Sequence, residues 1–243
     1  GEKARVCTGW GVRMIDVISG DAFQTIDGVI EGIRGTGRSP VLVTDPPFNV
    51  GYHYKSYDDR LPEREYWRSL ADMVRKFDGA CVVHYPEALD RLSIELGEAP
   101  VRRLSWVYPS NTARQHRDVA FYGVKPDFRN VRQPYRNMSD KRVKALYERT
   151  GGARSYDWVE VNQVKNVSRE KTAHPCQMPL KVMNLVIGVL PDGIVVVDPF
   201  CGSGTTLVAC RDRGVDAVGI ELDEDYASIA RARVLEAETG RHQ

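Results

Sequence analysis

Residues 194–206 read IVVVDPFCGSGTT, and this stretch indicates the fold class more strongly than any other part of the chain. Ile194–Val197 is a run of four β-branched residues, which is typical of a strand buried on both faces in a parallel sheet. The glycines at 202 and 204 predict a turn where the backbone can approach a ligand closely. Because residues 205–211 then follow a helical pattern, free N–H groups at the start of a helix would face the same ligand.

An acidic residue lies at a spacing that suits nucleoside binding. Glu221 stands seventeen residues after Gly204, at the end of the apolar run 217–220. An acid about 20 positions beyond a glycine-rich turn binds ribose hydroxyls in nucleotide-binding sheets. The third glycine of the dinucleotide fingerprint is missing, which argues against NAD or FAD. This part of the chain therefore predicts a nucleoside-binding half of a parallel sheet.

A second candidate loop lies far upstream, after the apolar run 41–44, and reads Asp45-Pro46-Pro47-Phe48. Both prolines have a fixed φ and no N–H, so the loop is stiff and presents carbonyl oxygens. The Asp45 carboxylate and the Pro46 carbonyl could accept the two hydrogens of an exocyclic amine while Phe48 stacks on its ring. An ordinary Asp-Pro turn is the alternative. Because both loops follow strands, we expect them to open on the same edge of the sheet.

These stretches together resemble the amino-methyltransferases of DNA, in particular the permuted group called beta class. In that group a DPPY-type catalytic motif comes first, a target-recognition segment follows, and an FxGxG cofactor loop comes last. The matching motifs are GDA at 20–22, DPPFN at 45–49, HPCQMP at 174–179, DPFCGSG at 198–204, and Glu221. The resemblance extends over residues 13–60 and 170–235, and over the middle of the chain by position only. Phe48 replaces the commoner Tyr, and Met178 replaces the commoner Lys, which puts a polar cofactor contact there in doubt.

The resemblance implies a Rossmann-like methyltransferase fold and S-adenosylmethionine as the cofactor, without a metal ion. Glu221 would hold the cofactor ribose, Asp21 and the Ala22 backbone its adenine, and Asp198 with residues 200–204 its methionine part. Thr205 would assist, with a simple helix cap as the alternative, and His174 would cap its proline-rich turn. The predicted catalytic residues are Asp45, Pro46 and Phe48, and the predicted cofactor-binding residues are Asp21, Ala22, Asp45, Asp198, Phe200, Cys201, Gly202, Ser203, Gly204, Thr205 and Glu221.

The implied reaction is methyl transfer to the exocyclic amine of a base flipped out of duplex DNA. A cationic sulfonium beside Asp45 would keep that carboxylate ionised. Because Asp rather than Ser opens the motif, the resemblance favours adenine N6, with cytosine N4 as the alternative. Two alternatives come from other classes: a catalytically silent nucleic-acid-binding relative and a nucleotide-dependent oxidoreductase. The intact motif residues argue against the first, and the missing third glycine argues against the second.

The net charge of +1 is unevenly distributed along the chain. Residues 101–171 hold 16 Lys and Arg against 7 Asp and Glu, an excess of nine positive charges, which leaves the rest at −8. Amide and aromatic side chains are interspersed in this basic middle. Phosphates attract positive charge, and amide and guanidinium groups read base edges, so this part predicts contact with double-stranded DNA. A solvated charged surface is the alternative.

Length and composition agree with one sizeable α/β core, with or without an insertion. The sequence contains no run of about 18 apolar residues, so it predicts no membrane-spanning helix. Five cysteines, an odd number without a CxxC pair, argue against disulfides and zinc and fit a reducing cytoplasm. The first residues, GEKAR, show no signal-peptide pattern. A homodimer and a restriction endonuclease partner are further expectations from the resemblance.

Alternating apolar strands and helices predict a doubly wound α/β sheet, mostly parallel with an antiparallel edge, plus a basic recognition insert. The expected strands are 13–19, 41–44, 80–84, 194–197 and 217–220, with an antiparallel pair at 104–108 and 119–124; the expected helices are 22–33, 63–77, 86–96, 205–211, 223–238 and one with Pro179 in its first turn. Residues 49–62 predict a mobile loop over the site. The expected parts are a catalytic half (1–125), a target-recognition insert without sustained periodicity (126–172) and a cofactor-binding half (173–243).

Overall fold

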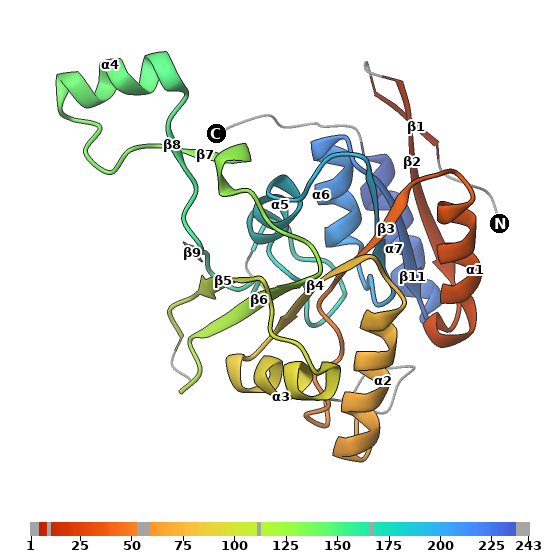
Figure 1. The fold of residues 1–243 in the computed structure, drawn as a ribbon. Coiled ribbons are helices and arrows are strands. Elements are labelled where there is room, and N and C mark those ends of the chain that lie inside the picture. Colours follow the sequence, from red (N-terminus) through yellow and green to blue (C-terminus); the bar gives the residue numbers. More distant parts are fainter. Residues whose placement is uncertain (1–4, 9–10, 53–58, 111–112, 166–167, 237–243) are drawn as a thin grey trace.

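A nine-stranded sheet runs through the computed structural model, which describes residues 5–8, 11–52, 59–110, 113–165 and 168–236 (Figure 1). Its order is β1-β2-β11-β10-β3-β4-β6-β5-β9. The strands are β1 (Arg5–Thr8), β2 (Gly11–Ser19), β3 (Ser39–Thr44), β4 (Gly79–His84), β5 (Arg102–Val107), β6 (His116–Tyr122), β9 (Trp158–Glu160), β10 (Ile194–Asp198) and β11 (Asp216–Glu221). The central strands β2, β11, β10, β3 and β4 are mutually parallel, which confirms the predicted sheet type.

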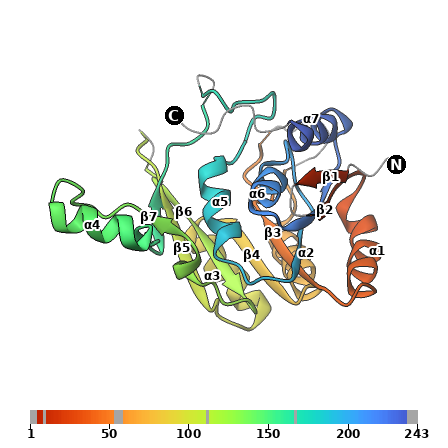
Figure 2. The ribbon, with the colours of Figure 1, turned by 90° about the horizontal axis from the view of Figure 1, so that it is seen from above.

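Helices cover both faces of the sheet, as a doubly wound fold requires (Figure 2). One face carries α1 (Ala22–Arg34), α2 (Glu63–Arg75) and α3 (Pro86–Leu96); the other carries α5 (Leu180–Gly188), α6 (Thr205–Arg213) and α7 (Glu224–Leu235). Successive residues of β3 alternate between the two cores, since Leu42 belongs to the first and Val41 and Val43 to the second. Burial on both faces explains why these strands read as continuous apolar runs.

The antiparallel edge extends one strand further than predicted. β6 pairs antiparallel with both β4 and β5, which confirms the predicted pair with slightly shifted ends. β9 then pairs in parallel with β5 and forms the outer edge of the described sheet. Its three residues alternate between exposed and half-buried, and so short a segment has no clear strand period in the sequence.

The insert contains regular structure that its sequence pattern did not predict. After the short turn η1 (Phe128–Asn130), β7 (Arg132–Gln133) and β8 (Ala153–Arg154) form a two-stranded ribbon, and α4 (Lys141–Thr150) lies between them. Asp140 caps the start of α4, and Gly151 ends it with a φ of 70°. No residue of α4 is buried, and Figure 1 shows the helix standing away from the sheet. Its apolar positions Val143, Leu146 and Tyr147 follow helical spacing but are only half-buried, and three positions are too few to make a sustained period in the sequence.

Several element ends also differ from the predictions. Pro179 is the N-cap of α5 rather than a residue of its first turn. Asp223 caps α7 by accepting hydrogen bonds from the N–H groups of Asp225 and Tyr226, and α7 ends at Leu235. Of the loop predicted at 49–62, residues 53–58 lie outside the described part of the chain. Among the helices of the described ranges, none has the length and apolarity of a membrane span.

The strand order places a topological switch point between β3 and β10. From β3 the chain moves outward to β4, whereas from β10 it moves outward in the opposite direction to β11. β3 and β10 pair in parallel, with Leu42 opposite Val197, so their carboxyl ends meet at one edge. Open α/β sheets bind their ligands at such a position.

Candidate active site

A cavity of about 400 Å³ opens at the switch point. It is lined by residues 45–48 after β3, by Pro199 and Phe200 after β10, by residues 20–23 after β2, and by Glu221 at the end of β11. The prediction that the two loops open on the same edge of the sheet is therefore confirmed. The basic charge of the insert is not part of this lining.

A buried hydrogen bond joins the two strands that carry the loops. Thr44 Oγ1 donates to Asp198 Oδ1 at 3.1 Å, and the Phe200 N–H donates to the same oxygen at 3.2 Å. Asp198 is only 3% exposed, and burial raises its pKa to about 7. The contact fixes where each loop leaves the sheet, because both partners are the last residues of their strands.

Asp45 presents a carboxylate with one unused oxygen. Its Oδ2 lies 3.8 Å from Arg117 Nη1, whereas its Oδ1 is buried and accepts no hydrogen bond from the described residues. Burial raises the pKa of Asp45 to about 6, and the positive charge of Arg117 opposes this rise. A buried acceptor without a donor is costly, so a ligand that brings an N–H group would be favoured here.

Glu221 links the end of β11 to both neighbouring turns. Its Oε2 accepts from the Gly202 N–H at 2.8 Å, its Oε1 accepts from the Asp223 N–H at 2.9 Å, and its backbone carbonyl accepts from the Gly20 N–H at 2.8 Å. Burial raises its pKa. Each carboxylate oxygen keeps a further lone pair, so Glu221 can still accept hydrogen bonds from hydroxyl groups of a ligand.

The two glycines of the turn are required by close contacts within the protein. Gly202 and Gly204 have φ values of 52° and 79°, in the region that side chains rarely adopt. A Cβ atom at Gly202 would lie 2.8 Å from His174 Nε2, and one at Gly204 would lie 2.8 Å from the Ala230 Cβ. The turn is thus held against α7 and the segment that carries His174.

Comparison with known proteins gives the family. Residues 99–232 match the family described as DNA methylase, of the N6/N4 type. The chain belongs to the N6/N4 DNA methylase family. It is 29% identical over 229 residues to the type II methyltransferase M.ScaI of Streptomyces caespitosus, covering 82% of this chain and 75% of that one. It is 23% identical over 214 residues to M.HpaI of Haemophilus parainfluenzae, covering 80% and 67%.

Solved structures agree with the fold of the methylase. The M1.HpyAVI–SAM complex superposes with a TM-score of 0.60 at 19% identity, covering 91% of this chain and all of that one. The cytosine-N4-specific PvuII DNA methyltransferase superposes with a TM-score of 0.62 at 17% identity, covering 93% and 88%. The family membership makes the chain a site-specific DNA methyltransferase and excludes the oxidoreductase alternative.

The predicted site residues of the methylase fall into two groups. Those that line the cavity are Asp21, Ala22, Asp45, Pro46, Phe48, Phe200 and Glu221. Those that do not line it are Asp198, Cys201, Gly202, Ser203, Gly204 and Thr205. The side chains of the second group serve protein contacts: Asp198 accepts from Thr44, and both Ser203 Oγ and Thr205 Oγ1 accept from Arg233 Nη1 at 3.1 Å. Asp21 has a structural task as well, since it accepts from the Phe23 N–H at the start of α1.

The cavity also contains residues that the sequence analysis missed. Arg117 of β6 lies opposite Asp45, with its guanidinium carbon 4.7 Å from the Phe48 ring centre and 5.4 Å from that of Trp106. Its Nε is buried without a described partner. As one charged residue within a strand, it belongs to no motif. β6 is buried without alternation from Asp118 to Tyr122, and Arg117 precedes the strand predicted at 119–124, so no local pattern marked it.

Two further residues hold Phe48 and the residues that follow it. His84 stacks on Phe48, with ring centres 4.1 Å apart and planes at 20°. Asp59, 1% exposed, accepts hydrogen bonds from the N–H groups of Asn49, Val50 and Tyr52. The conformation of the loop is therefore set by side chains on both sides of it.

His174 does more than cap a turn. Its ring lies against the glycine turn and meets the Tyr226 ring edge-on at 4.7 Å, and it lines the cavity. Burial, together with Lys171 and Arg233, lowers its pKa to about 4, so the ring is neutral at pH 7. Within the described residues, no group of three or more His, Cys, Asp or Glu is arranged to hold a metal ion.

Proposed function

We propose that this methylase transfers a methyl group from S-adenosylmethionine to N6 of an adenine that is flipped out of duplex DNA. The observation that carries the proposal is the shared cavity at the switch point. It brings the unused Oδ1 of Asp45 together with Glu221 and Asp21. The order of the motifs along the chain, with the Asp45 loop first and the glycine turn last, supports assignment to the permuted, beta-class arrangement.

The residues of the cavity fit the cofactor. Glu221 would accept from the ribose hydroxyls, and Asp21 with Ala22 would lie at the cofactor adenine. By the resemblance, the turn 202–204 would lie behind the methionine part of the cofactor, where the Gly202 N–H holds Glu221 Oε2 and the Gly204 N–H holds the Cys201 carbonyl. Asp45 and Asp198 are both buried with raised pKa values, so a cation nearby would stabilise their ionised forms. When bound, S-adenosylmethionine supplies a methyl group on a positively charged sulfur.

The catalytic task of the chain is to orient the amine. Asp45 Oδ1 and the Pro46 carbonyl would accept its two hydrogens and favour a pyramidal nitrogen with an available lone pair. Asp45 would then hold the proton that the amine loses as it gains the methyl group. Phe48 would stack on the base, which contributes about 1–3 kcal/mol. Because the Arg117 guanidinium carbon lies 4.7 Å from the Phe48 ring centre, a base that stacks on Phe48 would have to displace this guanidinium.

The assignment to adenine rests on Asp45. Asp at this position resembles the adenine-N6 enzymes, whereas the cytosine-N4 enzymes mostly have Ser there. Cytosine N4 remains the second candidate, because it presents the same combination of an amine beside a ring nitrogen. The PvuII enzyme, described as cytosine-N4-specific, has a similar fold. Identifying the methylated base, as N6-methyladenine or as N4-methylcytosine, distinguishes the two candidates.

The insert is proposed as the part that recognises DNA. Residues 126–172 lie in the basic middle of the chain, and the Lys and Arg side chains of α4 are exposed. The halves 1–125 and 173–243 would supply the catalytic loop and the cofactor turn, respectively. A homodimer and a partner restriction endonuclease belong to the same proposal, in keeping with the type II relatives.

The test is transfer of a radioactive methyl group to unmethylated genomic DNA. We expect wild-type transfer, and a loss of at least about 100-fold in Asp45→Ala. Asp90→Ala is the matched control, because Asp90 pairs with Arg103 outside the cavity. Wild-type transfer by Asp45→Ala would remove the role of Asp45. Cofactor binding without transfer to any DNA would favour the silent nucleic-acid-binding relative.

A further inference from the structure

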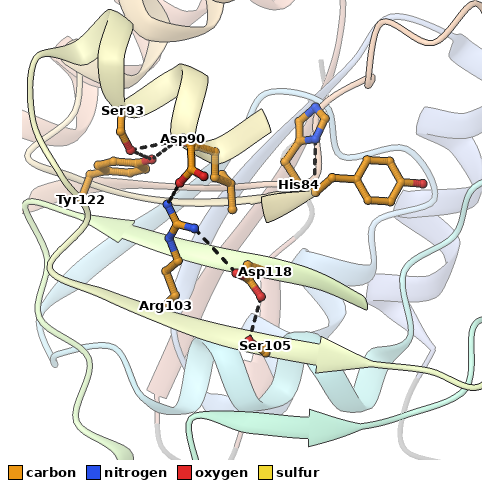
Figure 3. Close-up of polar contacts among 9 residues, drawn as sticks. His84, Asp90, Ser93, Arg103, Ser105, Asp118 and Tyr122 are labelled. Carbon is orange, nitrogen blue, oxygen red and sulfur yellow. Dashed lines mark hydrogen bonds and ion pairs between the residues drawn. The ribbon is translucent and has the colours of Figure 1, made fainter. Parts of the chain in front are cut away.

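His84 is a buried polar residue directly behind the catalytic loop, and the chemistry above does not use it. It is the last residue of β4 and is 3% exposed. Its ring stacks on Phe48 from the side of the sheet. Figure 3 shows the His84 ring with a dashed line at one nitrogen, which marks its hydrogen bond to the following backbone N–H.

The hydrogen bonds of His84 have a defined direction. The Tyr85 N–H donates to His84 Nδ1 at 2.8 Å, so Nδ1 carries no proton and the neutral ring holds its proton on Nε2. Nε2 lies 3.3 Å from Tyr66 Oη and must donate to it. Tyr66 in turn donates its own proton to the Pro47 carbonyl at 2.8 Å. Burial and the charges of Arg117 and Arg114 lower the pKa of His84 to about 3, so the ring stays neutral.

We propose that His84 and Tyr66 are positioning residues for the catalytic loop. The directed chain of hydrogen bonds from the Tyr85 N–H to the Pro47 carbonyl holds that loop in the geometry that methyl transfer needs. This inference rests on the function proposed above. It adds two residues, from β4 and α2, that no motif of the chain contains.

The chain of hydrogen bonds acts on the part of the loop that the prolines leave free. The Pro47 carbonyl belongs to the peptide unit that joins Pro47 to Phe48, so holding this oxygen sets the direction of Phe48. The prolines fix φ but not ψ, and a second restraint is therefore needed. With the Pro47 oxygen bound to Tyr66, the Pro46 carbonyl is the proline acceptor for the amine.

Space behind the loop makes such a restraint necessary. A second cavity of about 400 Å³ shares Phe48 and Tyr66 with the first and is also lined by Trp67 and His84. Without the chain of hydrogen bonds, Phe48 would have room to withdraw from the first cavity. A displacement of the loop by about 1 Å is enough to slow a reaction that depends on orientation about 100-fold.

Tyr66→Phe tests the proposal, because it removes one hydroxyl and keeps the ring that meets Trp67 edge-on at 4.7 Å. We expect the single-turnover rate of methyl transfer to fall about tenfold. Cofactor binding and the KM for DNA should change by less than about twofold, because the Tyr66 ring that lines the first cavity is kept and neither hydroxyl partner is among the side chains proposed to hold the cofactor. Wild-type transfer by Tyr66→Phe would overturn the proposal.

Tyr122→Phe is the matched control. Tyr122 is 1% exposed, lies on β6, and pairs through its hydroxyl with Ser93 Oγ at 3.0 Å and the Leu89 carbonyl at 3.3 Å (Figure 3). It lines neither cavity. We expect the two variants to lower the melting temperature similarly, and Tyr122→Phe to keep the wild-type transfer rate. Equal slowing in both would show that the effect is loss of stability.

A second pair of measurements separates this inference from the proposed function. His84→Phe keeps the stacked ring, and a double variant with Tyr66→Phe should be no slower than the slower single variant, because both break one chain. Amide hydrogen exchange over residues 48–52 should be faster in Tyr66→Phe and unchanged in Tyr122→Phe. Unchanged exchange in Tyr66→Phe would sink the inference. Faster exchange in a chain whose wild type methylates no DNA would sink only the proposed function.

Discussion

At the scale of single residues, two opposing effects act on the pKa of Asp45. Burial raises its pKa to about 6, and the guanidinium of Arg117, 3.8 Å away, acts against that rise. An amine can donate to the carboxylate, and lose a proton to it, only when Asp45 is ionised. The rate of methyl transfer should therefore fall as Asp45 becomes protonated below about pH 6.

We expect kcat/KM to fall about tenfold per pH unit below pH 6, because the protonated fraction of Asp45 grows in that range. Arg117→Met removes the charge that favours ionisation, so this acid limb should move to higher pH. Arg103→Met is the control, since Arg103 pairs with Asp90 and Asp118 outside the cavity (Figure 3). A pH–rate profile of Arg117→Met with an unmoved acid limb would contradict the account.

The residues of the site were predictable only where they follow a strand in a recognisable order. Asp45 and Glu221 each end an apolar run, so their place at the cavity follows from the rule for parallel sheets. His84 and Tyr66 lie within elements whose apolar pattern describes them as core, and Arg117 precedes the strand predicted at 119–124. Their place beside Phe48 depends on which strands pair with one another. A local sequence pattern does not predict the pairing of strands that are far apart in the chain.

At the scale of elements, Thr44 joins β3 to β10 through the buried Asp198 carboxylate. Thr44→Val keeps the shape and removes the donor, so Asp198 retains fewer hydrogen bonds at a buried site. We expect the free energy of unfolding to fall by about 1–3 kcal/mol, measured by urea denaturation. Thr36→Val, which removes a half-buried hydroxyl bonded to the Ile33 carbonyl at a helix end, should cost less. A Thr44→Val variant as stable as the wild type would show that the bond does not fix the two strands.

The helix α4 is expected to act through charge. Lys141, Arg142 and Lys144 lie on it and are exposed, and no residue of α4 is buried. Replacing these three with Glu should weaken DNA binding and reduce the slope of log K against log salt by about 0.9 for each phosphate that the variant no longer neutralises. The melting temperature should stay unchanged. Unaltered affinity and salt slope would assign DNA binding to another part of the insert.

The elements were predictable in proportion to their burial. β3, β4, β10 and β11 are apolar on both faces, so each reads as a continuous apolar run in the sequence. The helices α1, α2 and α3 each bury one apolar stripe, so each shows a helical period in the sequence. α4 buries nothing, and β7, β8 and β9 have two or three residues each. Segments of this kind are formed by caps, turns and neighbours rather than by a hydrophobic pattern.

At the scale of the whole molecule, the buried titratable groups set how stability depends on pH. The folded pKa values of Asp45 and Asp198 are raised to about 6 and about 7, so these groups favour the folded state when protonated. His84 and His174 have lowered pKa values of about 3 and about 4 and favour the folded state when neutral. Between about pH 4.5 and 6 the two effects oppose each other.

Above about pH 6.5 only the carboxylates among these groups still titrate. The folded chain then binds more protons than the unfolded chain, so stability is lost as pH rises through about 7. We expect the cofactor-free protein to lose about 1 kcal/mol of unfolding free energy between about pH 6.5 and 8, measured by denaturant titration. Asp198→Asn should flatten this dependence. Rising stability over the same range would show that Asp198 is ionised and well solvated.

The central claim is that the Asp45 loop and the cofactor turn act on one adenine amine at the switch point. Its most direct test is nucleoside analysis of DNA from cells that express the chain, with sequence mapping of the modified positions. The account predicts N6-methyladenine at one short sequence in wild-type DNA and none with Asp45→Ala. N4-methylcytosine at the mapped sites, or N6-methyladenine that persists in Asp45→Ala, would contradict it.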